Sequence, residues 1–289
     1  MGGASVTDVS ARPPARVPIL LRIAQARGGT AGLILIGFWL TVFLLSLAWT
    51  PHDPFAFSLT QKLVAPSADF WLGTDRYGRD VLSRIMAGCR EVMLISAGGT
   101  ALALALGLIV GVTAGFYGRL YDEGMMRLMD ILMAFPSLLL ALLVVGVLGP
   151  GYFNVILVVG AVFAPRIARV ARGAVLEVRQ KEFVEAALAR GDSAGNVMLV
   201  EILPNIVGPL GVEVGVRFAY AIFLSASLGF LGLGVQPPSP DWGLMVNEGR
   251  ELVDVAPWIS LAPACAIATL VVGVNLLSEA CRRIWAGEA

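Results

Sequence analysis

Hydrophobic and polar residues follow one another along this chain in long blocks, not with the short periods of a soluble helix or strand. Six apolar blocks are long enough to cross a ~30 Å hydrocarbon core at about 1.5 Å per residue. They cover residues 29–50, 92–116, 131–148, 152–169, 206–233 and 256–277. The pattern therefore predicts an all-α integral membrane fold with about six transmembrane helices.

Polar sequence separates these blocks and divides the chain. Residues 1–28 carry prolines and arginines without an apolar run, so we expect a polar tail and not a cleavable signal peptide. Residues 51–91 are predicted to form one polar segment outside the membrane. Residues 170–205 form a polar loop on the other side, and 279–289 a C-terminal tail. Residues 92–278 then hold the second to sixth spans.

The distribution of lysine and arginine predicts the orientation of the spans. Basic residues near span ends are retained on the cytoplasmic side of a membrane. If the N-terminal tail lies inside, both termini and the loop 170–205 are cytoplasmic and the segment 51–91 is periplasmic. The inner side then collects Arg12, Arg16, Arg22, Arg27, Arg119, Arg127, Arg166, Arg169, Arg172, Arg179, Lys181, Arg190, Arg282 and Arg283. The outer side holds Lys62, Arg76, Arg79, Arg84, Arg90 and Arg250.

Composition and charge exclude several classes of function. Hydrophobic residues make up 57% of the chain and charged residues 15%, and the formal net charge is zero. A nucleic-acid partner would call for a basic excess, so none is expected. His52 is the only histidine, which excludes metal sites that need two imidazoles. Cys89, Cys265 and Cys281 show no CxxC spacing, so we interpret them as small apolar residues.

Two motifs typical of enzymes are not supported. The phosphate-binding loop G-x-x-x-x-G-K-[ST] does not occur, because Lys62 and Lys181 each follow a glutamine. Residues 191–195 match G-x-S-x-G, but a helix is predicted before Ser193, whereas a nucleophile elbow requires a strand and a nearby histidine. The chain is therefore not expected to be an enzyme or to bind ATP.

Small residues recur every four positions in two of the predicted spans. Such a strip lies on one helix face and lets a second helix approach closely. We expect packing at these positions, with lining of a solute path as the alternative. The strips are Ala103, Gly107, Gly111 and Gly115 in the second span, and Gly211, Gly215 and Ala219 in the fifth.

The loop 170–205 has the pattern of a helix, a break, a short helix and a new span. Good helix formers fill residues 178–190, and one apolar stripe is predicted from Phe183, Val184, Ala187 and Leu188. Gly191 suits the left-handed end of a helix, with Asp192 or Ser193 as the next cap, and Pro204 suits a helix start. An amphipathic helix of this kind fits a groove on a cytoplasmic partner. A helix lying on the lipid surface is the alternative.

At these residues the chain resembles a known family. The spacing E-A-A, three residues, Gly, nine residues, x-x-L-P looks like the signature loop of binding-protein-dependent ABC importer permeases. The matching residues are Glu185, Ala186, Ala187, Gly191, Leu203 and Pro204. The resemblance implies that this loop docks into an ATPase subunit and transmits the nucleotide-driven closure of the ATPase to the permease.

Further stretches resemble the dipeptide, oligopeptide and nickel branch of that family, and the second of its two permease types. Residues 71–84 are similar to its LGTD..GRD segment, and residues 230–243 to its FLGLG.QPP...WG stretch. Asp122, Met126, Arg127, Asp130, Ala134, Phe135 and Pro136 match the pattern before its third span. The sequence departs from the branch at Glu201, at Ser225 and in residues 278–283.

The resemblance implies an architecture and a set of partners. Spans two to six would form a MetI-like permease core, with the first span as an accessory helix outside it. A homologous second permease, two cytoplasmic ATPases that bind ATP and Mg, and a periplasmic or lipid-anchored solute-binding protein are implied, in a bacterial inner membrane. Peptides are the expected solutes, and nickel chelates and glutathione stay open because the binding protein largely selects the solute.

Charged residues within and between the spans are further candidates. Glu213 and Arg217 lie four residues apart, a spacing that favours an ion pair on one helix. The pair either stabilises the fold or lines a translocation path, and Ser225 on the same span is a further candidate for the path. Asp75, Arg79 and Asp80 are candidates for contact with a periplasmic protein or with the second permease. An ion-coupled secondary transporter is the alternative function of another class.

Overall fold

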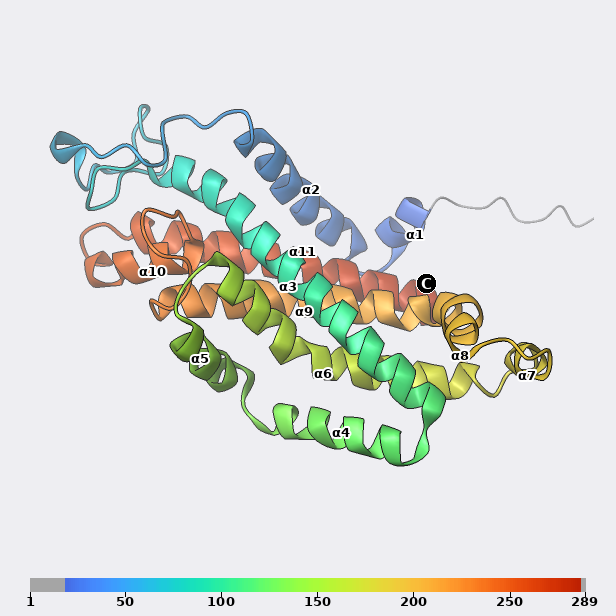
Figure 1. The fold of residues 1–289 in the computed structure, drawn as a ribbon. Coiled ribbons are helices and arrows are strands. Elements are labelled where there is room, and N and C mark those ends of the chain that lie inside the picture. Colours follow the sequence, from blue (N-terminus) through green and yellow to red (C-terminus); the bar gives the residue numbers. More distant parts are fainter. Residues whose placement is uncertain (1–18, 287–289) are drawn as a thin grey trace, which may run out of the picture.

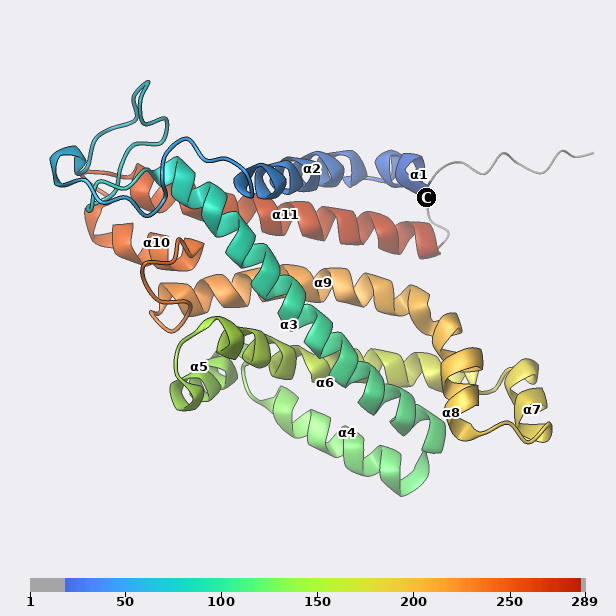
Figure 2. The same cartoon turned by 45° about the horizontal axis from the view of Figure 1, so that its top comes forward.

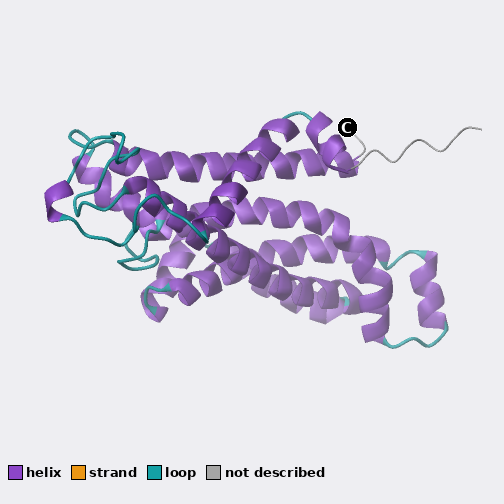
Figure 3. Ribbon diagram, turned by 90° about the horizontal axis from the view of Figure 1, so that it is seen from above, coloured by secondary structure: helices purple, strands orange, loops and turns teal. Residues whose placement is uncertain are grey.

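The computed structural model describes residues 19–286, and within them the chain is almost entirely helical (Figures 1 and 3). The predicted all-α fold is confirmed, since these residues contain no strand and a single bridge, between Thr74 and Asp80. The elements in order are α1 (Ile19–Gln25), α2 (Gly29–Ser46), η1 (Leu59–Gln61), α3 (Val81–Tyr117), α4 (Arg119–Ala134), α5 (Ser137–Leu148), α6 (Tyr152–Val178), α7 (Glu182–Ala189), α8 (Ala194–Asn196), η2 (Val197–Ile202), α9 (Leu203–Phe230), α10 (Trp242–Gly249), η3 (Arg250–Leu252) and α11 (Trp258–Ala286).

Five helical runs are long and apolar enough to cross a membrane, and the pair α4–α5 brings the number up to six if it is one span. The predicted third span, 131–148, has an unexpected shape, because α4 and α5 meet at 92°. Pro136 is the reason. It disfavours helical backbone at the residue before it, and Phe135 is extended, at φ −83° and ψ 137°. The predicted span 131–148 is therefore divided between two helices at a sharp bend.

The helix α3 begins at Val81, so the predicted polar segment 51–91 ends earlier than expected. Asp80 caps the helix by accepting a hydrogen bond from the backbone N–H of Ser83 at 3.0 Å. The charged residues in its first turns find partners inside the chain: Arg84 donates to the carbonyl of Ser239, whose hydroxyl contacts Glu91. A hydropathy pattern contains no information on such distant partners, so it did not predict that residues 81–91 belong to the helix.

The helices α3 and α6 form the most extensive helix contact of the molecule, along the predicted strip of small residues. A Cβ added at Gly107 would lie 2.7 Å from Cβ of Ile167, and one at Gly111 would overlap the carbonyl oxygen of Ala168. The predicted packing role of this strip is confirmed. In the second strip, Gly215 lies against Ser278 of α11, whereas Gly211 faces open space.

The two ends of the helix bundle differ in character. The helices α7 and α8 project at one end, where α1 and the last turn of α11 also lie (Figures 1 and 2). The segment 51–80 and α10 lie at the opposite end. Both helical termini of the described chain, Ile19 and Ala286, are therefore on the same side as α7. The helix α1 lies within the predicted polar tail, and residues 1–18 of that tail fall outside the described residues.

The helix α2 packs on the side of the bundle, next to α11 (Figure 2). Trp39 donates from Nε1 to Oγ1 of Thr269 at 3.1 Å, and Gly32 lies against the backbone of Leu277. The rest of α2 exposes large apolar residues, among them Ile34, Phe38 and Leu44. A helix with one narrow contact face and an apolar remainder suits the predicted accessory span.

Candidate functional site

The helix α7 is joined to the rest of the chain by one narrow face. Val184 and Ala187 are fully buried and belong to the same apolar cluster as Val197 and Ile202. Phe183 and Leu188 were predicted to share that stripe, but their side chains are exposed by 40% and 44%. The helix therefore presents two large apolar side chains away from the bundle.

The predicted break after α7 is present at Gly191. Its φ of +86° is left-handed, a conformation that glycine adopts without steric cost. A Cβ at this position would meet nothing within 4 Å, so only the backbone conformation calls for glycine. Ser193 then caps α8, accepting from the N–H of Asn196 at 3.3 Å, as one of the two predicted caps.

Pro204 lies in the first turn of α9, as the sequence predicts. No loop precedes it, however, because the chain is helical without interruption from Ala194 to Phe230. The stretch before it, η2, is a π-helix, in which the N–H of Leu203 bonds to the carbonyl of Met198, five residues back. Proline lacks an N–H and crowds the carbonyl four residues before it, and the wider π geometry accommodates this.

The six predicted coupling residues therefore occupy different environments. Glu185, Ala186, Gly191 and Pro204 are exposed, Leu203 is half-buried, and Ala187 is buried. Ala187 anchors α7, and the exposed residues form its free surface. Glu201, which departs from the family pattern, lies 3.6 Å from Arg190 across the loop.

The predicted pair on α9 is present. Nε of Arg217 lies 2.6 Å from Oε1 of Glu213, and the Arg217 guanidinium also lies 5.1 Å from the ring centre of Tyr220. Arg217 borders a cavity of about 370 Å³ between α5, α6 and α9. The cavity is lined by Ser137, Leu138, Phe163, Arg166, Arg217, Tyr220, Phe223, Leu224 and Ser227.

The third residue predicted for a path, Ser225, does not line this cavity. Its side chain is 2% exposed, because it faces the interior of the helix bundle. Ser227, two positions later, lines the cavity instead. Arg166, Ser137 and Tyr220 were not predicted either. Arg166 was counted only as a basic residue near a span end, and hydropathy alone gives no sign that it faces a cavity.

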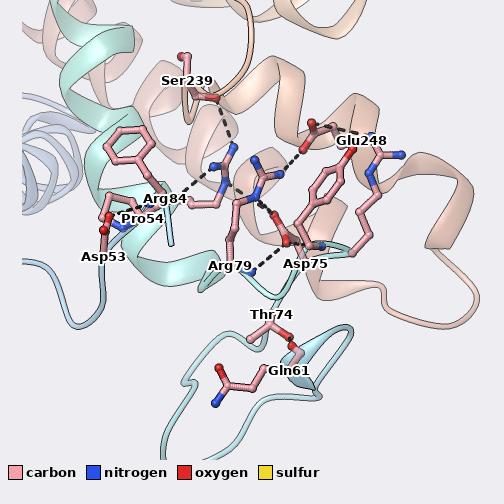
Figure 4. Close-up of polar contacts among 12 residues, drawn as sticks. Asp53, Pro54, Gln61, Thr74, Asp75, Arg79, Arg84, Ser239 and Glu248 are labelled. Carbon is pink, nitrogen blue, oxygen red and sulfur yellow. Dashed lines mark hydrogen bonds and ion pairs between the residues drawn. The ribbon is translucent and has the colours of Figure 1, made fainter. Parts of the chain in front are cut away.

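At the opposite end of the bundle, a buried charge network joins the outer segment to α10 (Figure 4). Arg79 lies at its centre. Its Nε contacts Oδ2 of Asp75 at 2.5 Å, and its Nη2 contacts Oε2 of Glu248 at 2.8 Å. Arg84 donates to the carbonyls of Pro54 and Ser239, each at 3.3 Å. The network connects segments that are far apart in the sequence.

This geometry corrects the prediction that Asp75, Arg79 and Asp80 present a contact surface. These residues are exposed by only 3–4%, and each has a polar partner within the chain, although Oδ1 of Asp80 is buried without a hydrogen bond. Asp80 accepts from the N–H and the hydroxyl of Ser83 and lies 3.5 Å from Nδ1 of His52. These residues hold the outer segment in place and do not face an external partner.

Asp241 is a second buried carboxylate at this end. It caps α10 by accepting from the N–H of Leu244 at 2.8 Å, and 1% of the residue is exposed. Burial raises the pKa of its carboxyl group to about 7, and nearby Glu91 adds to the effect. Among residues 19–286, no three His, Cys, Asp or Glu side chains meet in a way that could hold a metal ion.

Comparisons with known proteins agree with one another. Residues 103–283 match the family model described as binding-protein-dependent transport system inner membrane component. A dipeptide transport system permease protein, DppC, of Alkalihalophilus pseudofirmus is 37% identical over 87% of this chain and 83% of its own length. The nickel transport system permease protein NikC of Escherichia coli is 35% identical over 86% of this chain and 90% of its own length.

A solved structure supports the fold. The inward-facing MetNI methionine ABC transporter contains a chain that aligns with a TM-score of 0.57 at 20% identity. The alignment covers 71% of this chain and 96% of that one. The likeness therefore concerns the fold of about seven tenths of this chain.

Proposed function

The chain belongs to the family of binding-protein-dependent transport system inner membrane components, and on this premise we propose that it forms half of a solute path driven by separate ATPases. The observation that carries the proposal is the form of α7. It is fixed to the chain through Val184 and Ala187 and exposes Phe183, Ala186 and Leu188. The helix itself projects at the end of the bundle (Figure 1). Such a surface suits a groove on a cytoplasmic ATPase.

Packing of α7 on η2, and the continuous helix that runs from η2 into α9, link this surface to the interior. Movement of α7 acts on Val197 and Ile202 of η2, which share its apolar cluster. The helix η2 continues into α9, which carries Arg217 and Ser227 at the cavity. These helices would have two arrangements, and the ATPases would bind nucleotide more tightly in one of them. Nucleotide binding would then shift the population toward that arrangement.

The assembly follows from the same premise. A single chain with up to six spans does not enclose a path in this family's arrangement, so a homologous second permease is implied. Two ATPases that bind ATP and Mg would lie at the α7 end, and a solute-binding protein at the α10 end. More of the basic residues belong to the helix ends and loops near α7 than to the outer segment, which favours a cytoplasmic location for the α7 end and both termini in a bacterial inner membrane.

The proposed solutes are di- or oligopeptides. The similarity to DppC supports this choice, and the similarity to NikC keeps a nickel chelate as the alternative within the same mechanism. Glutathione, itself a peptide, is a third solute of the same chemical kind. The outer network around Arg79 would keep the periplasmic end rigid while the cytoplasmic end moves.

The proposal is tested by uptake into proteoliposomes that contain this chain with its sister permease, its ATPases and its binding protein. We expect uptake of a labelled dipeptide to require ATP and to stop with vanadate. Omission of the ATPases should abolish it. Uptake by the chain without ATPases, sensitive to collapse of the proton gradient, would instead establish an ion-coupled carrier.

A further inference from the structure

Two arginines face the cavity between α5, α6 and α9, and only one of them has a carboxylate partner. Arg217 is paired with Glu213, which does not line the cavity. Arg166 is half-buried, and within residues 19–286 its side chain has no ion pair or hydrogen bond. The cavity wall therefore carries an uncompensated positive charge within a helix bundle, where unpaired charge is costly.

The other polar groups of the cavity wall also favour an anion. Ser137 is the first residue of α5, and the cap before it, Pro136, makes no side-chain hydrogen bond. The free N–H groups of a first helical turn carry a partial positive charge. The hydroxyl group of Tyr220 can donate a hydrogen bond to the same space, whereas the hydroxyl of Ser227 donates to the carbonyl of Phe223 at 2.8 Å.

The remaining lining is apolar. Leu138, Phe163, Phe223 and Leu224 complete the wall. The volume of about 370 Å³ lies at the lower end of the range for small-molecule pockets, ~300–1,000 Å³. Such a wall suits an organic solute that has an anionic group at one end and an apolar side chain at the other.

We propose that this cavity is a solute subsite that binds a carboxylate, with Arg166 as its principal ligand and Arg217 as the second. The inference rests on the proposed transport function and specifies the solute class. A bare divalent cation is repelled at Arg166, whereas the C-terminal carboxylate of a peptide, or an anionic chelate of a metal, is attracted. The site therefore favours peptides over a free nickel ion.

The test uses the assembled importer with Cys89, Cys265 and Cys281 replaced and Ser227→Cys as a reporter in the cavity. The reaction rates of an anionic methanethiosulfonate (sulfonatoethyl) and a cationic one (trimethylammonioethyl) are compared, each relative to free cysteine. We expect the anionic reagent to be favoured. Arg166→Met should lower the ratio roughly fivefold or more, since one unit charge nearby affects both rates in opposite directions.

A matched control is one helical turn away. Arg169 pairs with Asp130 and borders a different cavity, so Arg169→Met should leave the ratio unchanged. Alanyl-alanine should slow the modification of the reporter, and alanyl-alanine amide, which lacks the carboxylate, should not. An anion preference that is absent, or unaffected by Arg166→Met, overturns the proposal.

One further outcome also decides against a solute site. If the anion preference depends on Arg166 but alanyl-alanine gives no protection, Arg166 makes the cavity positive without binding the carboxylate of a peptide. The labelling requires no ATP hydrolysis, so its result is independent of the uptake experiment. Failure of the carboxylate site and failure of the transport function can therefore be told apart.

Discussion

Nη2 of Arg79 lies 2.8 Å from Oε2 of Glu248, which is 169 residues later in the chain and on α10. The same guanidinium holds Asp75 through its Nε at 2.5 Å. One side chain thus joins the loop before α3 to the helix before α11. Since 3% of the Arg79 side chain is exposed, solvent screens these contacts weakly.

Removal of Arg79 should destabilise the outer end strongly. Arg79→Met leaves two poorly solvated carboxylates without their main partner, and breaking a buried pair in this way costs about 3–5 kcal/mol. Thermal unfolding of the purified chain in detergent measures the loss. Arg250→Met is the control, because Arg250 is 55% exposed and lies 3.9 Å from Glu251. An exposed pair contributes at most about 1 kcal/mol. Equal losses in the two variants would contradict the role of the network.

The contact of α3 with α6 predicts different effects for two glycines. Gly111→Ala should destabilise the chain by about 1–3 kcal/mol, since its Cβ would overlap the carbonyl of Ala168 and overpacking costs this much. Gly211→Ala has open space and lies within a helix, so it should stabilise by about 0.5–1 kcal/mol. Thermal denaturation in one detergent compares them. If Gly111→Ala were as stable as Gly211→Ala, α3 and α6 would not pack as closely as the strip of small residues requires.

The buried carboxyl group of Asp241 predicts a dependence of stability on pH. Its pKa is raised by burial to about 7, above the ordinary value of 3.8. Between these values the folded chain holds a proton that the unfolded chain has lost, so stability falls as pH rises through this window and levels off above it. Asp241→Asn keeps the cap on Leu244 without the titration. The wild type should lose about 2–3 kcal/mol relative to this variant between about pH 5 and about pH 8.

Parallel pH profiles of unfolding temperature for the wild type and Asp241→Asn measure this difference. Other carboxylates titrate equally in both proteins, so their contributions cancel. Identical profiles would show that the Asp241 carboxyl group is not shielded from water.

The left-handed backbone at Gly191 predicts an order among substitutions. Asn tolerates this conformation, Ala adopts it at a cost of about 1–2 kcal/mol, and Pro cannot adopt it because its φ is fixed near −65°. Coupling of ATP hydrolysis to uptake should therefore decrease from Asn to Ala to Pro, with similar amounts of protein in the membrane. A Gly191→Pro variant with normal uptake would rule out a role for this turn.

The sequence predicted the features that depend on local composition. The apolar runs predicted the spans, and the four-residue spacing of small residues predicted the packing strip at Gly107 and Gly111. The ability of glycine to adopt left-handed backbone predicted the turn at Gly191. The spacing of four residues between Glu213 and Arg217 predicted their ion pair. Each of these is decided within one helix or one turn.

What the sequence did not predict depends on distant partners. The first turns of α3 are charged, and Arg84 within them donates a hydrogen bond to the carbonyl of Ser239, 155 residues later in the chain. Arg79 looked exposed because its partner Glu248 lies on a helix that was not predicted. The break at Pro136 lies within an apolar run that was predicted as one span, although the proline itself indicates a possible helix boundary. Similarly, Ser225 and Ser227 differ only in which side of α9 faces the cavity.

The coupling role of α7 is tested most directly by the amount of solute taken up per ATP hydrolysed when a bulky charge is added to its exposed face. Ala186→Arg alters that face, and Ala68→Arg places the same side chain on the exposed outer segment. In proteoliposomes of the assembled importer, we predict that Ala186→Arg lowers this ratio at least roughly tenfold with unchanged membrane insertion, and that Ala68→Arg retains it. A tenfold change corresponds to about 1.4 kcal/mol. An unchanged ratio in Ala186→Arg would contradict the account.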